Sequence, residues 1–206
     1  AHLLLGDIYA EEKVWLKAFE HYREASRYTE EEEKGRALFG MALSLFSLSR
    51  YGDALPLLEE ILRDYPYATF IEEAEALWIE ALAREKRTEE ARRAFEQFFL
   101  RFPQSPFLER AMFWCAFALY EGKRWHEVKP FLEAFLARYP RGEFTQKAVE
   151  MLGYTCRFLG LEDEAAKHFG RLGGEEGMFL VADSFYRKRD WNGAEKAFQE
   201  YLARYP

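Results

Sequence analysis

The sequence predicts an all-α protein, a solenoid of six helix-turn-helix repeats. The first observation is a small residue, alanine in five of six places, that recurs at intervals of 36, 37, 37, 37 and 29 residues. The series is Ala18, Ala54, Ala91, Val128, Ala165 and Ala194. An interval of this length holds two helices with their turns, and a fixed period is typical of stacked repeats. The second observation is that apolar residues within each half-repeat follow the helical period, as in Leu38, Met41, Ala42 and Leu45.

Two further columns appear when the recurring alanine is numbered position 20. Position 8 is small in five of six repeats: Gly6, Ala42, Ile79, Ala116, Gly153 and Ala182. Position 24 is always large: Tyr22, Leu58, Phe95, Leu132, Phe169 and Phe198. Small residues at positions 8 and 20 let two helix axes approach closely, and the bulky residue at position 24 fills the space beside that contact. Ile79 should therefore loosen one helix crossing.

Aromatic-proline pairs close most of the repeats. They occur as Tyr65-Pro66, Phe102-Pro103, Tyr139-Pro140 and Tyr205-Pro206. Because proline lacks an N–H and disfavours helix in the preceding residue, each pair should end the second helix of its repeat. These breaks divide one predicted solenoid, residues 1–206, into repeats at about 1–29, 30–66, 67–103, 104–140, 141–174 and 175–206.

The fifth repeat departs from this pattern. The interval of 29 leaves it eight residues shorter than the others, and Gly173-Gly174 stands where an aromatic-proline pair would be. We expect its second helix to end early, after Leu172. A tolerated deletion between surface turns and a change of superhelical pitch, or a hinge before Glu175, are both compatible with this shortening.

The composition disfavours several classes of protein. Apolar residues are 49% and charged residues 32% of the chain, which predicts a folded protein with no direct membrane insertion. The net charge of -7 disfavours nucleic-acid binding, because the basic clusters Lys123-Arg124 and Arg187-Lys188-Arg189 are placed at helix ends. Cys115 and Cys156 are predicted to be small buried side chains without a disulfide.

The sequence contains no pattern that indicates catalysis, a metal site or a bound cofactor. His2, His21, His126 and His168 lack the spacing of metal ligands and are expected on helix surfaces. The acidic run Glu30 to Glu33 points around a helix and is favoured there by the helix dipole, so it is interpreted as a solvated face. We therefore predict a protein that is not an enzyme.

The repeat pattern resembles the tetratricopeptide repeat (TPR) family over the whole chain. Its residues are Leu5, Gly6, Tyr9, Ala18, Tyr22 and Ala25 in the first repeat, and Met178, Ala182, Phe185, Ala194, Phe198 and Pro206 in the last. The resemblance implies a right-handed superhelical solenoid. The period of 37 and endings such as ILRDYP and YLARYP are similar to a longer bacterial subtype, found in the Tol-Pal-associated periplasmic coordinator and the outer-membrane-assembly lipoprotein. That subtype implies the periplasm or cell envelope, with the cytoplasm as the alternative.

Both ends of the sequence fall inside the repeat pattern, so we expect a fragment of a longer protein. In TPR arrays, positions 2, 5, 9 and 12 of the first helices resemble a concave peptide-binding groove. Here these positions carry apolar residues where polar ones are expected, with charges interleaved. The candidate groove residues are Phe39, Leu43, Phe46, Arg110, Phe113, Phe117, Tyr120, Tyr154, Arg157, Phe179, Asp183 and Tyr186, and further charges are Arg36, Glu80 and Lys147.

Two interpretations of the groove aromatics stay open. Neighbouring first helices can pack tightly enough to bury them, or they can form a peptide groove, because exposed apolar patches rarely persist without a partner. The predicted function is a scaffold that binds a protein or peptide, with Arg110, Arg157 and Asp183 setting register. The alternatives are a structural module that stacks end to end, including self-association, and the docking arm of an enzyme that lies outside this sequence.

Overall fold

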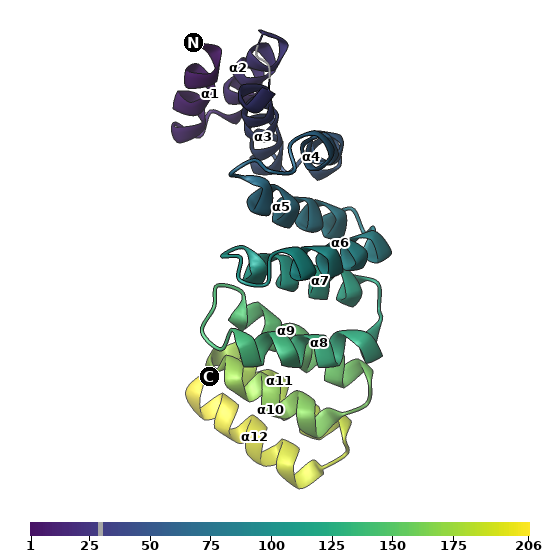
Figure 1. Cartoon of the computed structure of the whole chain (residues 1–206). Helices are drawn as coiled ribbons and strands as arrows, with labels where there is room; N and C mark the ends of the chain where they lie inside the picture. Colours follow the sequence, from purple (N-terminus) through teal and green to yellow (C-terminus); the bar gives the residue numbers. More distant parts are fainter. Residues whose placement is uncertain (29–30) are drawn as a thin grey trace. The chain divides into compact units, whose positions relative to one another are not determined.

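The computed structural model describes residues 1–28 and 31–206, and this part of the chain consists of helices joined by short connections, with no strand (Figure 1). The twelve helices are α1 (His2–Glu11), α2 (Trp15–Tyr28), α3 (Glu31–Ser47), α4 (Tyr51–Asp64), α5 (Ile71–Arg84), α6 (Thr88–Arg101), α7 (Leu108–Glu121), α8 (Trp125–Arg138), α9 (Thr145–Phe158), α10 (Glu162–Leu172), α11 (Gly174–Arg187) and α12 (Trp191–Arg204). The all-α prediction is confirmed. The predicted boundary between the first and second repeats lies outside the described residues. Glu30, the first residue of the acidic run, lies outside them too.

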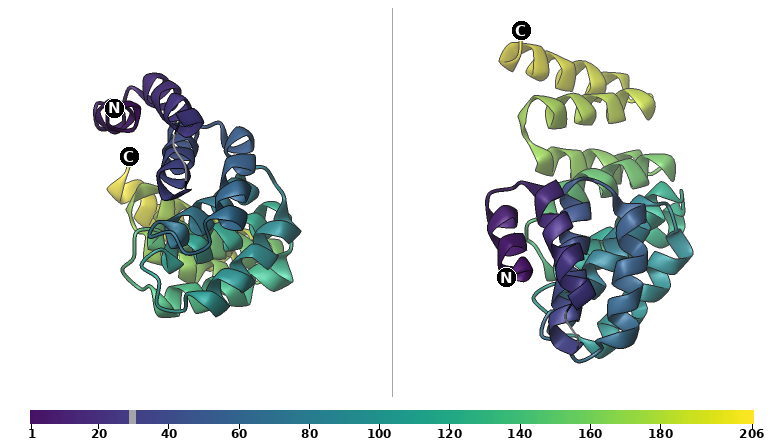
Figure 2. Two further views of the ribbon diagram at one scale, coloured as in Figure 1. Left: turned by 45° about the horizontal axis from the view of Figure 1, so that its top comes forward. Right: turned by 90° about the horizontal axis from the view of Figure 1, so that it is seen from above.

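By packing, the chain divides into two compact bodies. The N-terminal body is Ala1–Ala118 and the C-terminal body is Leu119–Pro206, so the division falls inside α7. In the N-terminal body, consecutive helices pack against each other from α1 to α6, and in the C-terminal body they do so from α8 to α12. Figure 2 shows these consecutive helices side by side within each body. Sequential packing of this kind is that of a helical solenoid. The number of repeats and the handedness of the superhelix stay predictions.

The predicted columns of small and large residues meet inside the repeats. Each residue at position 20 is buried, and the rings of Tyr22 and Phe169 cover glycines at position 8. A Cβ atom added to Gly6 would lie 2.6 Å from the Tyr22 ring, and one added to Gly153 would lie 2.5 Å from the Phe169 ring. Because real contacts are never that short, the close approach of the two helices requires glycine at these two places.

The second helices end where the aromatic-proline pairs predict. The last helical residues of α4, α6, α8 and α12 directly precede Tyr65, Phe102, Tyr139 and Tyr205. Each aromatic residue still donates its N–H to a carbonyl four residues earlier, and the proline that follows has no N–H with which to continue the helix. In the fifth repeat, α10 has 11 residues against 14 in these four helices, and it stops at Gly173 with φ of 65°. The early end of this helix is confirmed.

Each first helix ends in the same turn. The residue at position 15 has a positive φ in all six turns: Lys13, Ser49, Lys86, Lys123, Gly160 and Arg189. The N–H of the next residue donates to the carbonyl of position 11 over 2.8 to 3.0 Å, as Arg87 does to Leu82. This pairing is the Schellman motif, which satisfies carbonyls that the helix end would leave unpaired. The turn therefore fixes the direction in which each second helix follows its first helix. Position 15 of the turn is a glycine in only one of the six repeats.

Candidate protein-binding surface

The structure places the predicted groove residues at different depths. Phe39 is buried, with its ring stacked on Phe70 at 4.9 Å, and Phe113 is only 2% exposed. Both side chains take part in helix packing and present no surface to a ligand. Phe179 is 44% exposed, and Tyr186 is also exposed. The remaining apolar members are half-buried: Leu43, Phe46, Phe117, Tyr120 and Tyr154.

Aromatic side chains at positions 12 and 17 pair across the Schellman turn. The pairs are Phe46 with Tyr51, Tyr120 with Trp125, and Tyr186 with Trp191, with ring centroids 5.2, 5.2 and 5.5 Å apart and planes at 73°, 74° and 71°. This is the edge-to-face arrangement that aromatic quadrupoles favour. The sequence shows both columns, but their pairing depends on the turn geometry. The recurring spacing of five residues is the signal that could have found it.

The residue at position 13 of the next repeat covers two of these pairs. The guanidinium of Arg84 lies 4.5 Å from the Tyr51 ring centroid in the N-terminal body. In the C-terminal body the Phe158 ring stacks on Trp125 with centroids 4.4 Å apart and planes at 12°. Phe158 was not among the predicted site residues, because position 13 lies outside the four positions assigned to the groove.

Around Trp125 the surface is hollowed. A pocket of about 480 Å³, here called the aromatic pocket, is lined by Tyr120, Glu121, Lys123, Trp125 and Phe158. The Phe158 side chain is 57% exposed although it is large and apolar. Burial raises the pKa of Tyr120. Its phenol can both donate and accept a hydrogen bond. The pocket thus offers aromatic walls and one charge of each sign at Glu121 and Lys123.

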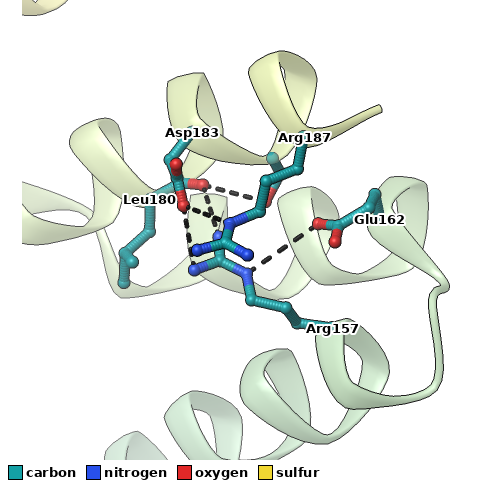
Figure 3. Close-up of polar contacts among 6 residues, drawn as sticks. Arg157, Glu162, Leu180, Asp183 and Arg187 are labelled. Carbon is teal, nitrogen blue, oxygen red and sulfur yellow. Dashed lines mark hydrogen bonds and ion pairs between the residues drawn. The ribbon is translucent and has the colours of Figure 1, made fainter. Parts of the chain in front are cut away.

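The predicted charges of α9 and α11 bind each other (Figure 3). Arg157, with a side chain only 11% exposed, places Nη1 3.0 Å from an oxygen of Asp183, and its Nη2 donates to Ser184 Oγ over 3.1 Å and to the Leu180 carbonyl over 3.3 Å. Arg187 also reaches Asp183, over 2.9 Å. Arg157 and Asp183 therefore join two neighbouring first helices and are not free to select a ligand by charge.

A similar cluster joins α5 to α7 in the N-terminal body. The Glu80 side chain, buried at 4% exposure, accepts from Arg84 Nε over 2.8 Å through one oxygen and from Arg110 Nε over 2.8 Å through the other. Arg84 additionally lies over the Trp114 ring at 4.1 Å. Arg110, which was predicted to set the register of a bound peptide, is thus engaged within the fold.

Histidine and cysteine placement adds two observations on reactive groups. His2 and His21 lie at the helix surface as predicted, where their Nδ1 atoms are 3.1 Å apart. His168 is half-buried, and burial lowers its pKa. Cys115 and Cys156 are free and buried, as predicted, and burial raises their pKa values to about 12 and about 11. Over residues 1–28 and 31–206, no group of three or more metal-ligating side chains comes together. In the same residues, no helix has the length and apolar character needed to span a bilayer.

Comparisons with known proteins agree with this architecture. The model of the outer membrane lipoprotein family YfiO matches residues 79–165, and that of the tetratricopeptide repeat matches residues 36–66 and 176–206. No curated protein matches the sequence. Helix pairs, a repeated turn and repeated packing columns define the class of helical repeat proteins. The fold of the chain is that of tetratricopeptide-repeat proteins.

Solved structures show the same fold at low sequence identity. PilW, titled a widely conserved type IV pilus biogenesis factor, is 16% identical, with 100% of this chain and 92% of that chain covered and a TM-score of 0.72. MamA from Desulfovibrio magneticus RS-1 is 17% identical over 82% and 93% of the two chains, with a TM-score of 0.67. A tetratricopeptide repeat protein from Parabacteroides merdae is 15% identical over 98% and 77%, with a TM-score of 0.65.

Proposed function

We propose that the chain is a non-catalytic scaffold that binds a segment of another protein, and that the aromatic pocket receives an apolar or aromatic side chain of that segment. The observation that carries this proposal is the exposed Phe158 ring stacked on Trp125 at the wall of the pocket. An exposed ring beside a hollow loses water-contacting apolar area when a side chain enters, which favours binding. Tyr154, Tyr186 and Trp191 provide further aromatic surface on the same body.

The remaining features support a protein ligand. Arg157 and Asp183 already satisfy each other, so the contribution of charge to recognition falls to groups at the pocket rim, namely Glu121 and Lys123. Rim charges govern register and association rate, while a buried aromatic anchor provides most of the affinity. We also propose a location in the cell envelope, which the outer membrane lipoprotein match and the fold of PilW support.

Replacing Phe158 with alanine should weaken peptide binding at least about tenfold, because the variant removes the exposed wall of the pocket. Peptides would first be selected from a displayed random library on the immobilised chain and then titrated by fluorescence anisotropy. Tyr67→Ala is the matched control, since Tyr67 is an exposed aromatic residue of the N-terminal body. Circular dichroism should show that both variants remain folded at the temperature of the titration.

The proposal is overturned if folded Phe158→Ala binds every selected peptide as tightly as the parent chain. It is also overturned if Tyr67→Ala weakens the same peptides equally, because the loss would then not report on the aromatic pocket.

A second candidate function is the end-to-end stacking of copies of this chain. It is favoured because apolar residues at the same repeat position differ in exposure from one repeat to another. Leu136 and Leu202 share position 28, yet they are 7% and 59% exposed. Phe113 and Phe179 share position 5 and show the same contrast. The first repeat also exposes Leu4, Ile8 and Leu16. Apolar surface of this kind is covered by a neighbouring repeat within an array, and a second copy can supply it.

If copies stack in this way, the weight-average mass from light scattering should rise with protein concentration. Leu202→Glu should return the mass to that of a monomer, because a charge at a covered apolar contact is costly. Leu100→Glu is the control, since Leu100 is an exposed leucine on α6. A constant monomer mass for the parent chain contradicts the stacking candidate.

A further inference from the structure

A second pocket lies in the N-terminal body, on the other side of a first helix. It has a volume of about 560 Å³, within the range of ligand sites, and is called here the α5 pocket. Its lining comes from α4 (Glu59, Leu62, Arg63), α5 (Glu75, Trp78, Ile79) and α6 (Glu90, Arg93, Ala94, Gln97, Arg101). The three α5 residues occupy positions 4, 7 and 8, which face the core, so this site is separate from the aromatic pocket and does not rest on the proposed function.

The third repeat breaks the packing pattern at the pocket. At position 4, other repeats bury apolar side chains, as with Leu38, Met112 and Val149, but here the buried residue is the carboxylic acid Glu75. At position 8, Ile79 replaces the usual small residue. Both substitutions line the same hollow. Since a buried carboxyl destabilises a core unless its oxygens are hydrogen-bonded, this placement calls for a role beyond packing.

The polar groups of the α5 pocket are only partly satisfied by the protein. Glu75 Oε1 accepts from Arg101 Nη1, and the carboxylate can accept further hydrogen bonds through its second oxygen. The indole Nε1 of Trp78 is buried and also has no acceptor in the described part of the chain. Buried polar atoms without partners are uncommon. The pocket residues thus leave one acceptor and one donor available to a ligand.

Charge and shape narrow the class of ligand. The lining holds three arginines and three glutamates, so their formal charges cancel, and a neutral ligand fits better than an ion. Leu62, Ile79 and Ala94 supply apolar walls. The pocket lining therefore calls for a neutral group with a flat apolar body. This group must also accept a hydrogen bond from an indole N–H and donate one to a carboxylate. A phenol meets these three requirements.

We propose that the α5 pocket binds the side chain of a tyrosine presented by a partner protein. The phenol oxygen accepts from Trp78 Nε1 and its O–H donates to Glu75, while the ring lies against Ile79 and Ala94. The rim of the α5 pocket carries charges of both signs, at Glu59, Arg63, Glu90 and Arg93. Such a rim suits the polar backbone of a peptide, so the occupant is the side chain of a partner protein and not a free phenol.

Blocked amino-acid amides test the proposal on the whole chain. N-acetyltyrosinamide should produce a saturable shift of the Trp78 indole N–H resonance in a spectrum of the five tryptophans, with Trp78→Phe assigning the signal. N-acetylphenylalaninamide should bind at least about tenfold more weakly, because it leaves both polar groups unpaired. By calorimetry, Trp78→Phe should also lose about tenfold in affinity for the tyrosine probe.

Filling the pocket provides a second variant that keeps its polar groups. Ala94→Leu should abolish binding, whereas Ala197→Leu, the same repeat position in the last repeat, should bind like the parent chain. Phe158→Ala should also bind normally, which separates this site from the aromatic pocket. Equal affinity for the tyrosine and phenylalanine amides overturns the proposal, as does the absence of a saturable shift. Binding of p-cresol without binding of the tyrosine amide overturns the assignment to a partner side chain.

Discussion

Replacing Phe169 with alanine is expected to destabilise the C-terminal body by about 3–5 kcal/mol. The ring is completely buried, lies on the bare backbone of Gly153, and meets the Tyr154 ring at 5.1 Å. The Arg157 guanidinium lies 4.9 Å from its centroid. Truncation leaves a cavity that Gly153 has no side chain to fill, and it removes the aromatic face beneath a buried charge.

Urea denaturation followed by circular dichroism measures this loss. Phe158→Ala is the matched control, because the same atoms are removed from a ring that is 57% exposed, and its cost should stay within about 1 kcal/mol. Similar losses for the two variants would show that Phe169 is not the packing centre that its burial indicates.

Replacing Glu80 with alanine is expected to lower the free energy of unfolding of the N-terminal body by about 2–3 kcal/mol. Removing one partner of a buried ion pair costs about 3–5 kcal/mol, because the other charge is left buried and unpaired. Here the two partners, Arg84 and Arg110, each keep side chains 34% exposed, so water compensates part of the loss. The value therefore falls below that of a fully buried pair.

The control for Glu80 is Asp53→Ala, which breaks the exposed pair of Arg50 and Asp53. That change should cost less than about 1 kcal/mol and should shrink further in 0.5 M salt. The cost of Glu80→Ala should persist in salt, since screening is weak for a buried carboxylate. A loss at Glu80 as small and as salt-sensitive as that at Asp53 would contradict the assignment of this cluster to the core.

The sequence predicts the helical architecture well because its signals are local. Helical periodicity, the proline after Tyr65 and the shortened fifth repeat each act within a few residues, and the structure has the corresponding helix ends. The columns at positions 8 and 24 were also predictable, since Gly6 and Tyr22 lie in one repeat and meet through the geometry of a single helix pair.

The candidate surface was less predictable because exposure depends on neighbouring repeats. Phe39 and Phe179 occupy the same repeat position, but one is buried and the other is exposed. Arg110 has the chemistry of a ligand-binding residue, and only its distance to Glu80 shows that it is already paired. Phe158 escaped notice because its importance comes from stacking on Trp125, a contact between two repeats.

Five of the six Schellman turns hold a residue with a side chain, such as Lys86, in the left-handed region that glycine occupies without strain. Such a conformation costs about 1–2 kcal/mol per residue, and only Gly160 avoids it. Because the stability of a repeat array is a sum of local terms, this strain is distributed along the chain in small and nearly equal shares. A glycine at Lys86 or Lys13 relaxes one turn at a time. The array can thus be strengthened or weakened repeat by repeat without altering its packing columns or its pockets.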